Sequence, residues 1–335
     1  MGRELFTKPE LSALAALRAR FLDGSNAGGG YWKSAADLAL YDASFGERIG
    51  WKWDAVLGEL NARGWRPAAK HVVDWGCGSG IAGRRVLAAW DGFESLTLTD
   101  VSAFAMRFAE SRARETFPRL HVRTTAHAAA ATAGSLLLVS HVLNETDDAA
   151  AHRLIGAARR AEEILWVEAG THADSRRLIA VREELRAEFD IVAPCTHAAR
   201  CGMLVPENAA HWCHHFANAP SEASRDARWA QFGRELGIDM RSLPYSFLVL
   251  ARRGARAPEE RGLSRIIGRP RDEKGHFDVL SCSEEGVEDL MAQKRDVPEL
   301  SKQLRKGRAP AVQRWTRDGR RITGATPSRA RDVTE

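Results

Sequence analysis

The sequence predicts an α/β protein with a mostly parallel sheet, a helical cap before the sheet and a Cys/His-rich insertion after its fifth strand. Short apolar runs alternate with helical stretches from residue 70, a glycine-rich turn follows the first run, and regular periodicity is lost between Cys195 and Asn218. The chain has 335 residues, which suits about two domains or one large domain with an insert.

The first 66 residues predict helices without a sheet of their own. Apolar residues recur at helical spacing between Pro9 and Leu22, and a loop follows. Ser34 and Asp37 then resemble a capping box at the start of the next helix. We therefore expect residues 1–66 to form an N-terminal helical cap.

Five apolar runs predict parallel strands, because the length between successive runs suits a crossover helix. The runs cover residues 71–75, 96–99, 120–123, 136–140 and 164–168. They define a predicted α/β core over residues 67–190. Further runs at 245–250 and 277–280 predict that residues 241–300 supply the final strands of this core.

Composition excludes several classes of protein. Hydrophobic residues make up 44% of the chain and charged residues 28%, so the chain is neither disordered nor fibrous. No apolar run approaches the roughly 18 residues of a membrane-spanning helix, and the start lacks a secretory apolar region. We expect a soluble cytoplasmic protein in which the five cysteines serve metal binding, catalysis or burial rather than disulfides.

Positive charge is concentrated at the end of the sequence. Residues 301–335 contain ten lysines and arginines but three acids, so this segment carries +7 against +5 for the whole chain. A basic segment that includes Trp315 could follow a phosphate backbone, and a solvated terminus is the alternative. We describe residues 301–335 as a basic C-terminal tail.

A glycine-rich turn follows the first predicted strand in the pattern D-x-G-x-G-x-G, from Asp74 to Gly80. Glycines let a backbone approach a ligand closely, and the helix that follows offers unpaired N–H groups. The pattern resembles the first motif of S-adenosylmethionine-dependent methyltransferases. The resemblance implies that Gly76 and Gly78 belong to a turn that cradles the methionine part of the cofactor, and that Asp100, at the end of the next strand, holds its ribose.

A dinucleotide-binding turn is the competing interpretation, because residues 78–83 also match G-x-G-x-x-G. Asp74 argues against this, since its charge would repel a pyrophosphate, and the additional Gly76 suits the methyltransferase turn. No catalytic residue is identified. The sequence lacks an Asn-Pro-Pro-aromatic motif and a Pro-Cys pair after the fourth strand, where His141 could serve as a base and a structural role is the alternative.

The irregular segment, residues 191–240, contains three cysteines in the spacing C-x5-C-x11-C, at Cys195, Cys201 and Cys213, and Cys282 follows 69 residues later. This differs from the C-x3-C-x2-C of radical enzymes. Zinc with sulfur and nitrogen ligands is possible, and four thiolates could equally hold an iron–sulfur cluster. Spacing alone leaves both metals open. Four histidines accompany the first three cysteines: His197, His211, His214 and His215.

The motifs around these cysteines resemble those of the methyltransferase-like small-ribosomal-subunit assembly factors, known from mitochondria and with bacterial relatives. The matching segments are Pro-Cys-Thr-His at 194–197, Trp-Cys-His-His-Phe at 212–216, Leu-Asn-Glu at 143–145, Val-Glu-Ala-Gly-Thr at 167–171, Tyr-Ser-Phe-Leu-Val-Leu at 245–250 and Gly-His at 275–276. Thr196 and Gly202 stand where the family often has proline, and His214-His215 is a doubled histidine.

The resemblance implies a methyltransferase-like domain that binds S-adenosylmethionine and carries a [4Fe-4S] cluster ligated by Cys195, Cys201, Cys213 and Cys282. It also implies the small ribosomal subunit and its rRNA as partners. Three functions remain open: an rRNA methyltransferase, a non-catalytic assembly factor that uses the fold to bind RNA, and a zinc-containing small-molecule methyltransferase.

Overall fold

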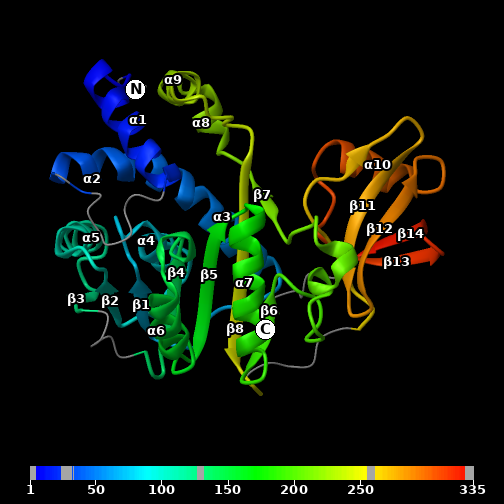
Figure 1. The fold of residues 1–335 in the computed structure, drawn as a ribbon, viewed down its shortest axis with the longest axis horizontal. Coiled ribbons are helices and arrows are strands. Elements are labelled where there is room, and N and C mark those ends of the chain that lie inside the picture. Colours follow the sequence, from blue (N-terminus) through cyan, green and yellow to red (C-terminus); the bar gives the residue numbers. More distant parts are fainter. Residues whose placement is uncertain (1–4, 24–31, 33, 127–131, 255–260, 329–335) are drawn as a thin grey trace. The chain divides into compact units, whose positions relative to one another are not determined.

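The computed structural model describes residues 5–23, 32, 34–126, 132–254 and 261–328 (Figure 1). The chain divides into two compact units. The first unit comprises Met1–Asn61, Trp65–Glu168 and Ala217–Tyr245, and the second comprises Ala62–Gly64, Ala169–Phe216 and Ser246–Glu335. No helix in the described ranges is long and apolar enough to cross a membrane.

The first unit is built on five parallel strands in the order β3-β2-β1-β4-β5. Each corresponds to one of the five predicted runs, which confirms the parallel sheet. Their bounds are β1 His71–Trp75, β2 Ser95–Thr99, β3 His121–Thr124, β4 Leu136–Ser140 and β5 Glu163–Ala169. Three helices connect them: α4 Ile81–Ala89, α5 Ala103–Thr116 and α6 Asp148–Ala158.

The strand order reverses direction between β1 and β4, which are neighbours in the sheet. Ligands of open α/β sheets bind at such a switch point, beyond the carboxyl ends of the strands. The central strands are apolar on both faces, and Leu136 to Val139 of β4 are fully buried. This burial explains why these strands are continuous apolar runs rather than alternating patterns.

The N-terminal helices belong to the first unit. They are α1 Lys8–Asp23, α2 Ala35–Tyr41, a π-helical turn over Asp42–Gly46 and α3 Glu47–Ala62. Ser34 caps α2 as predicted, because its hydroxyl accepts the Asp37 N–H at 3.0 Å. The π-helical turn was not predicted, since apolar spacing continues through it.

Two helices from the predicted insertion also lie in the first unit: α8 Ser221–Arg225 and α9 Ala227–Leu236. The rings of Trp229 and Trp51 are 4.7 Å apart, and those of Phe232 and Phe45 are 5.2 Å apart. Aromatic and aliphatic residues at helical spacing in α9 therefore face the N-terminal helices. Only the first part of residues 191–240 is irregular.

The second unit contains the cysteine-rich segment and a second sheet. Its first elements are α7 His172–Leu185, β6 Phe189–Ala193, the 3-10 turns Gly202–Leu204 and Pro206–Asn208, and β7 His215–Ala217. β8 Leu243–Arg252 pairs antiparallel with β6. The second sheet has six strands in the order β10-β11-β12-β14-β13-β9. Its elements are β9 Ser264–Ile266, β10 Arg271–Asp272, β11 His276–Ser283, β12 Gly286–Gln293, α10 Pro298–Arg305, β13 Val312–Asp318 and β14 Arg321–Pro327.

This second sheet changes two expectations. Residues 264–293 form four of its strands instead of completing the parallel core. Most of the expected basic tail is also folded, because α10, β13 and β14 bury Leu304 and Ile322 in a common apolar core. Several of its arginines are paired with acids: Arg317 lies 2.5 Å from Glu288, and Arg321 lies 2.6 Å from Asp296. These pairs offset part of the charge that led us to predict a free basic segment.

Candidate functional site

The glycine turn after β1 uses three left-handed residues. Gly76, Gly78 and Gly80 have φ values of +68°, +51° and +76°, which side chains other than glycine adopt with strain. A Cβ at Gly76 would lie 2.7 Å from the Val142 side chain, and one at Gly80 would lie 2.9 Å from the Cβ of Ala109. A Cβ at Gly78 would meet no atom within 4 Å. The outer glycines are therefore fixed by packing, while Gly78 faces open space.

Two carboxylates stabilise this turn. Asp100, just after β2, accepts the Gly78 N–H at 2.9 Å with one oxygen and the Ser102 N–H at 2.9 Å with the other. Asp74 is fully buried and accepts the Gly83 N–H at 3.1 Å. Burial raises the pKa of Asp74 to about 7. Asp74 thus ties β1 to α4 beneath the turn, which removes the basis for the charge-repulsion argument against a dinucleotide.

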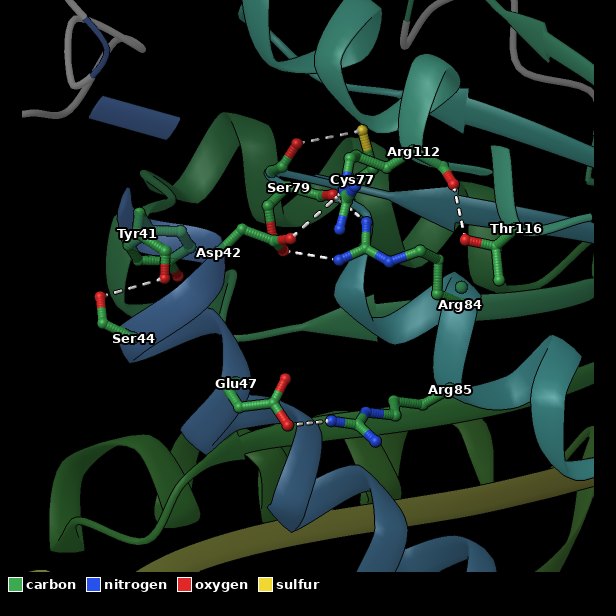
Figure 2. A network of polar contacts seen from close by, with 12 residues as sticks. Tyr41, Asp42, Ser44, Glu47, Cys77, Ser79, Arg84, Arg85, Arg112 and Thr116 are labelled. Atoms are coloured by element: carbon green, nitrogen blue, oxygen red, sulfur yellow. Dashed lines mark hydrogen bonds and ion pairs between the residues drawn. The ribbon is translucent and has the colours of Figure 1, made fainter. Parts of the chain in front are cut away.

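The π-helical turn is joined to the glycine turn by a buried ion pair (Figure 2). One Arg84 nitrogen lies 2.6 Å from an Asp42 oxygen, and another donates to the Ser79 carbonyl at 2.6 Å. The two charged side chains are about one-tenth exposed. The Ser79 hydroxyl is buried and has no hydrogen-bond partner among the described residues. A polar group therefore remains available within the turn.

The carboxyl end of β4 carries the candidate base, His141. Its φ is +56°, and it is the only described non-glycine residue with a positive φ. The Lys52 ammonium lies 3.1 Å from its Nε2, and the Ser140 hydroxyl lies 3.3 Å from its Nδ1. Burial, then the Lys52 charge, lowers the pKa of His141 well below its usual value, so the ring is neutral at neutral pH. Because an ammonium can only donate, Nε2 accepts from Lys52.

All four cysteines of the predicted metal site line one small cavity in the second unit. The cavity has a volume of about 40 Å³, compared with the roughly 10–15 Å³ that one water needs. The other lining residues are mainly apolar and include Leu178, Ile179 and Met203. Four separate segments of the chain therefore bring thiols to one apolar place.

The thiols in this cavity are desolvated. Burial raises the pKa of Cys201 to about 11 and also raises the pKa of Cys213 and Cys282 above the usual value of a thiol. A metal centre would have to displace their protons, which couples its binding to pH. Among the residues that the structure describes, no group of three or more His, Cys, Asp or Glu side chains was found that could hold a metal ion.

Residues 53–315 match the protein family described as "Mitochondrial small ribosomal subunit Rsm22". The chain belongs to this family. The match confirms the family that the cysteine and strand-end motifs indicate, and the chain has the α/β methyltransferase-like fold with a mostly parallel central sheet. No curated protein matches the chain.

Solved structures similar to this Rsm22-family chain include methyltransferases. The magnesium protoporphyrin IX methyltransferase of Synechocystis, solved with bound S-adenosylmethionine, has 14% identity and a TM-score of 0.39 over 75% of this chain and 100% of its own. A protein of Thermoplasma acidophilum, numbered 1320, has 14% identity and a TM-score of 0.36 over 61% of this chain and 86% of its own.

Two motifs of the Rsm22-family chain are joined by one buried carboxylate. Glu168, at the end of β5, accepts the Val142 and Leu143 N–H groups at 3.1 Å each and the Trp166 indole N–H at 2.7 Å. The Leu-Asn-Glu segment after β4 is thus held by the Val-Glu-Ala-Gly-Thr segment of β5. This contact gives a structural reason for the co-occurrence of both motifs.

The two positions where the family often has proline also have structural counterparts. The Thr196 hydroxyl donates to the Leu263 carbonyl at 2.9 Å, a bond that proline cannot make. A Cβ at Gly202 would lie 2.8 Å from the backbone nitrogen of Val287. Any side chain at position 202, proline included, would therefore force the turn between β11 and β12 to move.

The sequence analysis did not identify several residues that lie near these sites. Val101 is 68% exposed directly after Asp100, an unusual position for a large apolar side chain. Lys52, Arg84 and Arg182 reach their sites from helices, where a single cation looks like part of a solvated face. Only the adjacency of Val101 to a predicted acidic site residue could have singled it out.

Proposed function

We propose that this Rsm22-family protein binds S-adenosylmethionine in the first unit, carries a [4Fe-4S] cluster in the second unit, and acts on the small ribosomal subunit and its rRNA. The observation that carries the proposal is the occurrence, in one chain of this family, of an open glycine turn with an acidic partner and of four thiols lining one cavity. Free thiols favour a reducing compartment, and we assign the protein to the cytoplasm.

The glycine turn fits S-adenosylmethionine in shape and polarity. The space beside Gly78 is open, the Ser79 hydroxyl lacks a partner in the part of the chain that the structure describes, and Val101 presents an exposed apolar surface. We assign Gly76, Gly78 and Gly80 to the cofactor turn, with Asp100 as an acceptor for ribose hydroxyls and Asp74 as its buried support. When bound, S-adenosylmethionine would supply an electrophilic methyl group on a sulfonium sulfur.

The cysteine cavity fits an iron–sulfur cluster by its donor set. Cys195, Cys201, Cys213 and Cys282 provide the four thiolates that such a cluster requires, and the other residues that line the cavity are mainly apolar. When bound, the cluster would cross-link segments of the second unit that are distant in sequence. Zinc ligated by the same thiols, with His197 in reach of Cys282, is the alternative centre.

The contribution of the protein to methyl transfer would be alignment. In-line attack by an RNA base or ribose oxygen needs proximity and orientation, which rigid strand ends can supply. His141 already shares its Nε2 with Lys52, so the described contacts leave it occupied. This observation favours the second candidate function, a non-catalytic assembly factor in which the methyltransferase fold contributes an RNA-binding shape.

Two measurements on the full-length protein test these proposals. Oxygen-free purification should give a coloured protein that contains iron and sulfide, whereas colourless protein with zinc would contradict the cluster. Calorimetry should show S-adenosylmethionine binding that Asp100→Asn weakens about tenfold or more, because a ribose acceptor and a bond to Gly78 are altered.

The substrate requires a genetic comparison. Mapping rRNA methylation in cells with and without the gene should reveal one small-subunit nucleotide that loses its methyl group. The protein could bind S-adenosylmethionine while its deletion leaves rRNA methylation unchanged and causes immature small subunits to accumulate. In that case the assembly-factor function replaces the enzymatic one. Normal subunits and normal rRNA in the deletion would contradict both.

A further inference from the structure

Three nitrogen groups face three different sulfurs of the cysteine cavity. The Nε of Arg182 donates to the Cys195 sulfur at 3.3 Å. The Nε2 of His197 lies 3.5 Å from the Cys282 sulfur, and the Nε2 of His215 lies 3.8 Å from the Cys213 sulfur. These distances are within the range of N–H hydrogen bonds to sulfur.

Arg182 is held firmly in this position. Its side chain is only 3% exposed, and its Nη2 donates to the His197 and Ala199 carbonyls at 3.2 and 2.9 Å. Its Nη1 is paired with Glu183. The guanidinium therefore has little freedom to move away from the sulfur of Cys195.

Of the two histidines, His215 is oriented by a second contact. The Nη2 of Arg265 lies 3.4 Å from the Nδ1 of His215. Because a guanidinium only donates, Nδ1 accepts and Nε2 carries the proton that faces Cys213. His197 Nδ1 has no hydrogen-bond partner among the described residues, so its only protein contact of this kind is the one through Nε2.

We infer that Arg182, His197 and His215 are positioning residues that donate N–H groups to three ligand sulfurs of the proposed cluster and raise its reduction potential. The inference rests on the proposed cluster. Donors near sulfur stabilise the extra electron of the reduced state, and a charged donor does so more strongly than a neutral one. Arg182 should therefore have the largest effect of the three.

The test is a redox titration of full-length protein purified without oxygen, monitored by the electron paramagnetic resonance signal of the reduced cluster. Arg182→Gln should keep wild-type iron and sulfide content but lower the equilibrium constant for one-electron reduction about tenfold, equivalent to about 59 mV. His197→Gln should lower it about threefold. Arg182→Lys, which retains the charge, should fall between wild type and Arg182→Gln.

Arg176→Gln is the matched control. Arg176 lies on the same helix and donates to the Met203 and His211 carbonyls at 2.9 and 3.2 Å, but its described contacts include no sulfur. The cluster in Arg176→Gln should have the same reduction potential as the cluster in the wild type. If Arg182→Gln and His197→Gln both keep full iron content and the wild-type reduction potential, the inference is overturned but the proposed cluster is not. Wild-type protein without iron and sulfide would overturn the cluster, and the inference with it.

Discussion

The glycine turn and the cysteine cavity show two ways to build a site. The turn is local: residues 74–83 supply its backbone, and Asp100 follows on the next strand. The cavity is assembled from four segments, and its first and last cysteines, Cys195 and Cys282, are 87 positions apart. Backbone geometry holds the first site, whereas the second needs apolar packing and, in our proposal, an inorganic centre. The second should therefore be more sensitive to loss of one side chain.

The largest expected effect comes from the cavity. Cys213→Ser should remove nearly all bound iron and lower the free energy of unfolding by more than about 4 kcal/mol, because the cluster couples ligation to folding. Iron analysis and thermal unfolding under anaerobic conditions measure both quantities. Cys77→Ala is the control, since Cys77 lies in the glycine turn and should leave iron content unchanged. Equal iron in both variants would contradict the cavity as the metal site.

The second prediction concerns the buried carboxylate under the turn. The pKa of Asp74 is about 7 in the folded protein and close to 3.8 in the unfolded chain. At a pH between these two values, the Asp74 carboxylate therefore takes up a proton when the chain folds. The stabilisation is present at low pH and is lost as pH rises through about 7. Between pH 4 and pH 8, Asp74→Asn should gain up to about 4 kcal/mol of unfolding free energy relative to wild type.

Urea unfolding at several pH values measures this difference. Glu94→Gln supplies a control of opposite sign, because Lys70 lowers the pKa of the exposed Glu94, whose small stabilisation is lost as pH falls. Parallel stability curves for Asp74→Asn and wild type would contradict the raised pKa of Asp74.

The third prediction separates backbone strain from ligand contact. Gly78 and Gly134 both have positive φ, +51° and +66°, and a Cβ at either would meet no atom within 4 Å. Alanine at each position should cost a similar amount of stability, about 1–2 kcal/mol. Only Gly78→Ala should also weaken S-adenosylmethionine binding, by about 30-fold or more, as measured by calorimetry. Equal affinities in the two variants would place the cofactor elsewhere.

The smallest expected effect tests the link between the glycine turn and the N-terminal helices. Arg84→Gln removes the ion pair with Asp42 and weakens the contact to Ser79, so S-adenosylmethionine affinity should fall about threefold to tenfold. Arg85→Gln is the neighbouring control, because Arg85 pairs with Glu47 at 2.7 Å instead (Figure 2). A larger loss of S-adenosylmethionine affinity in Arg85→Gln than in Arg84→Gln would contradict the role given to Arg84.

Sequence analysis succeeded where the determinants are local. The five parallel strands, the cap at Ser34 and the glycine-rich turn after the first strand follow from apolar runs and short motifs that each specify their own backbone. It failed for the second sheet, because its strands carry charged residues that pair only after folding, as Arg317 does with Glu288. Composition made this segment look like a basic tail.

In both sites, some features could be predicted from the sequence and others could not. The position of Gly78 and Asp100 could be predicted from spacing, but the burial of Asp74 and its bond to Gly83 could not. The four cysteines could be grouped by resemblance to a family, whereas the donors that face their sulfurs could not. Arg182 precedes Cys195 by 13 positions on a helix that carries two other arginines, and nothing local distinguishes it from them.

The distance along the chain between Cys195 and Cys282 has a consequence for biosynthesis. A ribosome that has translated the first three cysteines must still add the whole of β8, β9 and most of β11 before the fourth becomes available. A nascent chain therefore has an incomplete cavity during that interval. If the site holds the proposed cluster, iron delivery must come late in synthesis or after release, and an arrested translation product would expose unshielded thiols to oxidants.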